Sequence, residues 1–223
     1  FAAANRDEFH HRPTAPLAFW PDAPDILAGR DLESGGTWMG VTRTRRFAAL
    51  TNYRDPSSLQ SGAKSRGLLV SGFLSGNASA IDYGETVRRG ARDYNGFNLL
   101  LCDGRTLLWI GHQGRDEVQV CELAPGVHAL SNHLPGTPWP KLVRARHAFH
   151  DAIRAARGGD ALFEAAYSLL SDETQAADED LPDTGVGLEW ERRLSPVFIR
   201  GQDYGTRSSS VLQMTTQHIR VEE

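Results

Sequence analysis

The sequence predicts an α+β fold in which helices cover antiparallel β-sheets. Short apolar runs separated by turn residues fill the middle third of the 223-residue chain, as expected for a meander of strands. Two longer amphipathic segments follow and are split by Gly158 and Gly159, which predicts a pair of helices. Because no repeat or linker divides the chain, we expect a single domain over residues 1–223.

The first half of the chain is expected to contain a hairpin and two helices. Four prolines forbid a regular helix over residues 12–25, which we expect to be an extended loop. Apolar runs at residues 37–42 and 46–51 predict a β-hairpin. The apolar spacing of residues 65–74 predicts a short helix, and Ser79 is suited to cap another that follows it.

The second half combines the meander with the helix pair and a closing hairpin. Strands are expected at residues 97–101, 106–110, 118–123 and 127–130. Helices are expected at residues 139–157 and 160–170, before an acidic stretch at 172–194 that we expect to be a mobile excursion. The last expected strands lie at residues 195–199 and 207–215, with another beginning at 217.

Composition excludes several classes of partner. The net charge is -4, with 24 basic against 28 acidic side chains and no basic stripe, so neither nucleic acid nor an anionic membrane is indicated. No apolar run is long enough for a transmembrane segment, and we expect a soluble, cytoplasmic protein. Nothing in the sequence indicates the oligomeric state.

Metal and cofactor motifs are missing from the sequence. The histidines show no zinc-binding spacing, and His147 with His150 is expected to form a solvated helix face. Cys102 and Cys121 lie in alternating apolar runs, where we expect reduced thiols that act as small core residues. There is no glycine-rich phosphate loop and no serine-hydrolase elbow, so we expect no standard cofactor.

Polar residues recur where the predicted strands end. They are Asn5, Arg6, Asp7, Asn52, Arg54, Asn132, His133 and Arg207. Each of them, taken alone, is a better candidate for capping a turn than for a site. Their repetition at several strand ends favours a functional site, because catalytic and binding residues concentrate where a rigid sheet presents its ends.

The motifs around these residues resemble the NRDE family, also called the transport and Golgi organisation protein 2 family. The tetrapeptide Asn5, Arg6, Asp7 and Glu8 carries the family name. The other matching motifs follow in the family's order at residues 12–14, 29–31, 35–38, 50–54, 131–132 and 204–208. The resemblance covers nearly the whole chain.

The resemblance implies a fold like that of the N-terminal nucleophile hydrolases, a four-layer αββα sandwich of two antiparallel sheets between helical layers. In such enzymes the first residue is the nucleophile, and its α-amino group, with a pKa of about 8, is the base. The family's candidate nucleophile is a cysteine after the initiator methionine, whereas this chain opens on Phe1. We therefore expect a chain that is truncated at both ends and inactive as given.

The resemblance also implies roles for the polar residues. Arg6 and Asp7 resemble the pair that orients the acyl group and holds the amine, and Asn132 resembles an oxyanion donor. Arg207 resembles an arginine that supports the nucleophile or a substrate carboxylate. A structural, buried ion-pair cluster of Arg6, Asp7 and Arg207 is an equal alternative. The candidates for ligand binding are Asn5, Asn52, Arg54 and His133.

Two functions of different class follow from the resemblance. The first is a pocket that binds a small acyl, lipid-related or haem ligand. The second is a cysteine-type amide hydrolase or acyltransferase whose N-terminal cysteine is missing from this chain. For haem, His10 and His11 are the candidate axial ligands, although a surface position fits them better. For acyl-coenzyme A, Arg43, Arg45 and Arg46 form either a phosphate patch or a solvated turn.

Overall fold

The computed structural model describes residues 1–115 and 117–223, which form two compact units. The large-sheet unit comprises residues 12–125 and 131–134, and the small-sheet unit comprises residues 1–11, 126–130 and 135–223. Each unit is a β-sheet with helices packed on it, which confirms the α+β class. The single domain, the four-layer stacking of the sheets and the likeness to N-terminal nucleophile hydrolases stay predictions.

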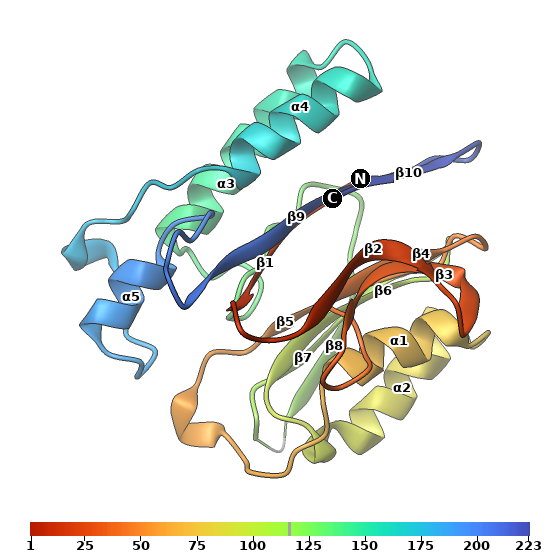
Figure 1. Cartoon of the computed structure of the whole chain (residues 1–223), viewed down its shortest axis with the longest axis horizontal. Coiled ribbons are helices and arrows are strands. Elements are labelled where there is room, and N and C mark those ends of the chain that lie inside the picture. Colours follow the sequence, from red (N-terminus) through yellow and green to blue (C-terminus); the bar gives the residue numbers. More distant parts are fainter. Residues whose placement is uncertain (116) are drawn as a thin grey trace. The chain divides into compact units, whose positions relative to one another are not determined.

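The large-sheet unit is built on a seven-stranded antiparallel meander (Figure 1). Its strands follow the chain order from β2 to β8, so each connection joins neighbours in the sheet. The strands are β2 (Thr14–Trp20), β3 (Ala23–Asp31), β4 (Met39–Thr42), β5 (Phe47–Asn52), β6 (Phe97–Cys102), β7 (Leu107–His112) and β8 (Val118–Glu122). The hairpin of β4 and β5 and the first three strands of the predicted meander are thereby confirmed.

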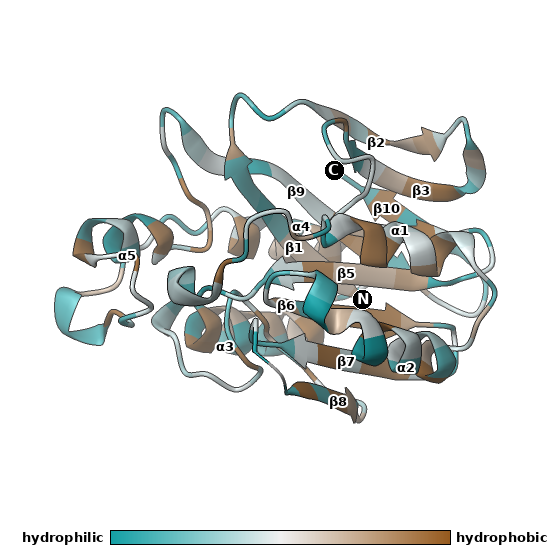
Figure 2. Ribbon diagram, turned by 90° about the horizontal axis from the view of Figure 1, so that it is seen from below, coloured by the Kyte–Doolittle hydropathy of each residue, from teal (hydrophilic) through white to brown (hydrophobic). Residues whose placement is uncertain are grey.

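Two helices pack on this sheet and bury its core. They are α1 (Gly67–Ser75) and α2 (Ala80–Gly90), and Ser79 caps α2 by accepting a hydrogen bond from the Asp82 amide, as predicted. Apolar residues line α1 and β7 (Figure 2). The core includes the fully buried side chains Phe73, Phe97, Leu99, Leu101 and Ile110.

The loop expected at residues 12–25 is wrong, because β2 and the start of β3 form a hairpin there. The prolines exclude a helix, as predicted, but they tolerate this hairpin. β2 is the edge strand of the sheet, and the pairing is irregular between Ala15 and Ala18, on either side of Pro16. Proline is compatible with an edge strand because its missing N–H lies where no ladder hydrogen bond is needed.

The small-sheet unit has three strands and two main helices. β9 (Tyr204–Met214) lies between β1 (Ala2–Phe9) and β10 (Ile219–Glu222), antiparallel to both. The hairpin of α3 (Pro140–Ala155) and α4 (Gly159–Leu170) follows the predicted helix pair, with Gly158 at a φ of 135° between them. Phe163, Ala166 and Leu170 of α4 pack on β1 and β9, where Val211 of β9 completes the cluster.

Several expected elements of the second half are corrected by the structure. The acidic stretch contains a 3-10 turn at Asp178–Asp180 and a short helix, α5 (Leu188–Leu194). In the first half, 3-10 turns lie at Pro56–Ser58 and Ala91–Asp93. Residues 127–130 and 195–199 form no strand. The predicted pairing of 195–199 with 207–215 is therefore wrong, because β9 pairs instead with β10 and with β1, which lies about 200 positions away and for which local patterns carry no signal. The strand expected to begin at 217 is confirmed as β10.

The two cysteines differ in their surroundings. Both thiols are free, as predicted, but Cys121 is exposed on β8 and Cys102 is only half-buried. The expectation that both act as core residues is therefore wrong for Cys121, because β8 is an edge strand whose side chains from Val120 to Glu122 face solvent. Among the described helices, none has both the length and the apolar character needed to cross a bilayer.

Candidate functional site

The NRDE tetrapeptide lies inside β1 and not at its end. β1 runs from Ala2 to Phe9 and pairs with β9 along its whole length. The strand continues past the charged residues because β9 supplies hydrogen-bonding partners there. The expectation that Asn5, Arg6 and Asp7 terminate a strand is therefore wrong.

Asn5 ties β1 to the rest of the small-sheet unit. Its Nδ2 donates to the carbonyl oxygens of Leu170 at 2.8 Å and Val197 at 2.9 Å. Its Oδ1 accepts a hydrogen bond from the Ser209 hydroxyl at 2.7 Å. Both amide hydrogens are thus used within the unit. Asn5, predicted to bind ligand, takes a structural part in this arrangement.

A β-bulge at Arg207 sets which side chains share a face of the small sheet. Arg6 pairs with Ser208 but Asp7 pairs with Thr206, so Arg207 is the extra residue of β9. The Thr206 hydroxyl consequently donates to Asp7 Oδ1 at 2.7 Å. Bulges re-aim side chains and occur often beside functional sites.

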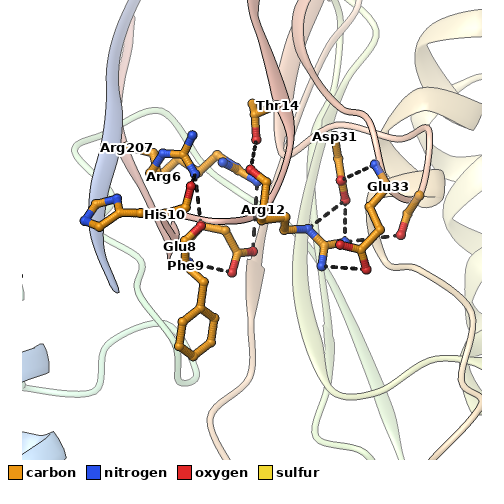
Figure 3. Close-up of polar contacts among 10 residues, drawn as sticks. Arg6, Glu8, Phe9, His10, Arg12, Thr14, Asp31, Glu33 and Arg207 are labelled. Carbon is orange, nitrogen blue, oxygen red and sulfur yellow. Dashed lines mark hydrogen bonds and ion pairs between the residues drawn. The ribbon is translucent and has the colours of Figure 1, made fainter. Parts of the chain in front are cut away.

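Arg6 and Arg207 are the other charged residues beside this bulge. Arg6 is 8% exposed, and its Nη2 lies 3.9 Å from Glu8 Oε2. The Arg207 guanidinium donates to the carbonyl oxygens of Phe9 at 2.9 Å and His10 at 3.1 Å (Figure 3). Arg207 thereby holds the end of β1, and Arg6 is a buried cation with a carboxylate nearby. Arg6, Asp7 and Arg207 all lie in the small-sheet unit.

A second polar cluster in the large-sheet unit brings together the other four predicted residues. Segment 131–134 lies beside the end of β5, where the Arg54 amide donates to the Asn132 carbonyl at 2.7 Å. The Asn132 side chain donates in return to the Asn52 carbonyl at 3.0 Å. Arg54 Nη2 lies 3.5 Å from Asn132 Oδ1. We name Asn52, Tyr53, Arg54, Asn132 and His133 the strand-end cluster.

Asn98, which the sequence analysis missed, fixes the strand-end cluster to the sheet. This buried residue of β6 donates to the carbonyl oxygens of Ser131 at 3.3 Å and His133 at 3.0 Å. Its Oδ1 accepts from the Trp109 indole at 3.1 Å. A lone amide in the apolar run of residues 97–101 was the available signal, because a buried amide requires partners.

Tyr53 and His133 form the chemically most distinctive contact of the strand-end cluster. The Tyr53 hydroxyl donates to Gln113 Oε1 at 3.2 Å and lies 2.9 Å from His133 Nε2. The tautomer of His133 decides whether the hydroxyl or Nε2 is the donor in this contact. The rings also stack, with centroids 4.9 Å apart. Tyr53 and Gln113 are further residues that the sequence analysis missed, although Tyr53 belongs to the motif at 50–54.

Burial keeps both members of this pair neutral. Burial lowers the pKa of His133, and the positive charge of Arg54 lowers it further. Burial also raises the pKa of Tyr53, with a smaller contribution from Asp55 that Arg115 partly opposes. At neutral pH the strand-end cluster therefore presents a phenol, a neutral imidazole and the guanidinium of Arg54.

The described residues offer little support for metal or haem binding. No group of three or more potential metal ligands comes together in the part of the chain that the structure describes. His10 is exposed, with Nε2 3.0 Å from the Gly201 carbonyl, and the exposed His11 ring stacks on Phe9. Haem iron is held in crevices whose polarity and access the protein controls, so these two surface histidines do not fit axial ligation.

A separate pocket of about 320 Å³ lies beside α5 in the small-sheet unit, and no predicted site residue lines it. Three of its arginines each pair with a carboxylate, which leaves it no excess of positive charge. The pairs are Arg192 with Asp178, Arg193 with Asp203, and Arg200 with Glu173. For Arg46, both expectations, a phosphate patch and a solvated turn, are wrong, because this residue is buried and donates to the carbonyl oxygens of Phe73 and Ala78.

The structure is that of an α+β protein with a hydrogen-bonded polar cluster on each of its two sheets. Sequence comparisons identify its family. The pattern of the transport and Golgi organisation 2 family matches residues 2–222. The chain belongs to this family, which is the NRDE family of the predicted resemblance.

Relatives of the chain include animal proteins of the same name. It is 39% identical to a bovine transport and Golgi organization protein 2 homolog (Bos taurus) over 228 residues, covering 94% of this chain and 80% of the relative. Identity to the human homolog (Homo sapiens) is 36% over 227 residues, with the same coverage. Identity to the Drosophila melanogaster protein is 25% over 240 residues, covering 97% and 82%.

Proposed function

We propose that the chain binds a small acyl or lipid-related ligand and that the strand-end cluster holds the ligand's polar end. The observation that carries the proposal is the Tyr53–His133 contact beside Arg54, on a segment fixed to the sheet by Asn98. Rigid placement of polar side chains on irregular backbone is typical of binding sites.

The donors of the strand-end cluster suit a carboxylate or a polarised acyl carbonyl. Arg54 supplies a planar guanidinium, whose geometry matches a carboxylate. The Asn132 amide uses one N–H for the Asn52 carbonyl, so its second N–H is a donor for a ligand oxygen. With Tyr53 and His133 neutral, Arg54 supplies the cluster's positive charge, which favours a ligand with one negative charge.

Calorimetric titration with octanoate tests this proposal. Arg54→Gln removes the guanidinium and should weaken binding by roughly 10-fold or more, as expected for loss of a charge-assisted hydrogen bond. Arg105→Gln, at an exposed turn of the same unit, is the matched control and should bind like the unaltered chain. Equal weakening by both changes, or no octanoate binding, would contradict the proposal.

Haem is the other ligand that the resemblance implies, and absorption spectroscopy separates it from the acyl ligand. Because His10 and His11 do not fit axial ligation, we expect haem to leave them unliganded. Titration of the chain with haem should give the same spectrum before and after the double change His10→Ala and His11→Ala. A shifted haem band that this double change abolishes would place haem at these histidines and overturn that expectation.

Amide hydrolysis or acyl transfer is a second candidate, favoured by the bulge that aligns Asp7 with Thr206 beside buried Arg6. The resemblance gives the nucleophile's role to a cysteine outside the given sequence. The test is acylation of the full-length protein by a thioester probe, followed by intact mass. Asp7→Asn should slow acylation without unfolding the chain, and an unchanged rate would remove Asp7 from the reaction.

A further inference from the structure

Helix α3 has one face buried in the small-sheet unit and one face open to solvent. On the inner face, Phe149 packs against the core of α4 and β9, and buried Lys141 donates from Nζ to the Leu194 carbonyl at 2.8 Å. These contacts fix the rotation of the helix about its axis. The opposite face of α3 therefore points away from the core of the small-sheet unit.

The outer face of α3 carries cationic and aliphatic side chains together. Ala148, Asp151 and Ala155 are also exposed on this helix, and its other six exposed residues fall within an arc of about 120° at 100° per residue. They are Val143, Arg146, His147, His150, Ile153 and Arg154, and exposed Arg157 follows the helix end. Val143 is 38% exposed and Ile153 is 44% exposed, so the aliphatic side chains contribute to this surface. We name this set the outer α3 face.

The arginines of the outer α3 face lack carboxylate partners. Within the part of the chain that the structure describes, no acidic side chain lies at ion-pair distance from Arg146, Arg154 or Arg157. Arg144 on the side of the same helix does pair, with Asp172 at 3.4 Å. Asp151 is an exposed acid on the same helix beside this face, and its Oδ1 lies 3.4 Å from His150 Nδ1.

The overall charge concealed this local excess of cations. The net charge of -4 results in part from the seven acids of the segment that leads into and includes α5, at positions 173, 178, 179, 180, 183, 189 and 191. In the net charge of the whole chain, the negative charges of that segment cancel the positive charges of the outer α3 face. A surface with three unpaired guanidiniums is therefore compatible with an acidic protein.

We propose that the outer α3 face binds the surface of an anionic phospholipid membrane. The guanidiniums match phosphate and carboxylate head groups, and each basic residue near such a surface raises the partition coefficient about fivefold. The exposed Val143 and Ile153 favour lipid over nucleic acid or an acidic protein, because aliphatic side chains among cations insert at the head-group boundary. The interaction is peripheral and requires no membrane-spanning helix.

Vesicle co-sedimentation tests this inference. The chain should bind phosphatidylcholine vesicles that contain phosphatidylserine and should not bind pure phosphatidylcholine vesicles. Changing Arg146, Arg154 and Arg157 to glutamate should lower the partition coefficient by about 100-fold or more, from three basic contacts at fivefold each. A second variant, Val143→Ser with Ile153→Ser, should bind several-fold more weakly with the charge unchanged.

A charge-matched control separates the outer α3 face from the effect of net charge. Arg89, Arg105 and Arg115 are exposed in the large-sheet unit, and changing them to glutamate alters the total charge equally. This control should retain binding, and circular dichroism should show that every variant is folded. The proposal is overturned if phosphatidylserine vesicles do not bind, if both triple variants lose binding equally, or if heparin but not vesicles binds through α3.

Discussion

Tyr53 Oη lies 2.9 Å from His133 Nε2, although 80 positions separate the two residues in the sequence. The contact joins the end of β5 to segment 131–134, which belongs to no helix or strand. It depends on Asn98, which bonds the carbonyl oxygen of His133 from the neighbouring strand. The polar chemistry of the large-sheet unit is thus placed by a buried amide in its sheet.

Asn98→Ala should destabilise the large-sheet unit by about 3 kcal/mol. The change leaves buried carbonyl oxygens and the Trp109 indole without their partner. Urea unfolding measures the loss. The control is Asn95→Ala, which removes hydrogen bonds to the backbone of Gln60 at an exposed site and should cost less than about 1 kcal/mol. Similar costs for both changes would contradict the structural importance of Asn98.

Stability should fall as the pH drops below about 6.5, the usual pKa of an unfolded histidine. His112 is 1% exposed, neither ring nitrogen has a hydrogen-bond partner among the described residues, and burial lowers its pKa. The backbones of Glu117 and Tyr94 partly oppose this shift. The unfolded chain therefore binds a proton that the folded chain refuses, and stability rises with pH over this range.

Urea unfolding at pH 7.5 and pH 5.5 checks this dependence on His112. The loss should approach about 1.4 kcal/mol per pH unit for this group. His112→Leu should reduce the difference between the two pH values, whereas His218→Leu, at an exposed site, should leave it unchanged. If His112→Leu shows the same difference in unfolding free energy between the two pH values, groups other than His112 cause the pH dependence.

Gly36→Ala should destabilise the fold by about 1–3 kcal/mol. A Cβ at this position would lie 2.5 Å from the Gly67 carbonyl carbon and 2.7 Å from its oxygen, and backbone atoms cannot rotate away. Gly90→Ala is the contrasting variant, because no described atom lies within 4 Å of its added Cβ. It should be neutral or stabilising by up to about 1 kcal/mol in a thermal melt. The reverse order of stability would contradict the close packing at Gly36.

Arg207→Gln should loosen the chain at the end of β1. The guanidinium that bonds the Phe9 and His10 carbonyl oxygens is lost, at a cost of about 1 kcal/mol. Hydrogen exchange should become faster at the His10 amide, which bonds the Asp203 carbonyl. Arg200→Gln, on an exposed ion pair, should leave that amide unchanged. If His10 exchanges equally in both variants, Arg207 does not anchor this turn.

Local signals predicted most of the large-sheet unit. Ser79 marks the start of α2, and alternating apolar residues mark β4 to β8. The pairing of β1 with β9 was missed because its register depends on residues about 200 positions apart and on the bulge at Arg207. The helix α5 was missed because acidic composition with Pro and Gly indicates flexibility.

The candidate site was predicted only in part, because local signals mark strand ends but not long-range hydrogen bonds. Turn-forming side chains at Asn52 and Asn132 pointed to strand ends, and the structure brings them together. The hydrogen bonds of Asn98 to two distant carbonyl oxygens could not be read from its own surroundings. Asn5 has the same residue type as Asn132, yet its amide is used by Leu170 and Val197, which only the tertiary fold reveals.

The central claim, that a ligand's polar end binds beside Tyr53 and His133, is tested most directly by nitrogen NMR of the histidine side chains during titration with octanoate. The claim predicts that the His133 resonances shift with a saturable dependence on octanoate and that Arg54→Gln weakens this response. The exposed His218 should remain unchanged as an internal reference. Saturable binding that leaves His133 unshifted, or shifts that persist unaltered in Arg54→Gln, would contradict the account.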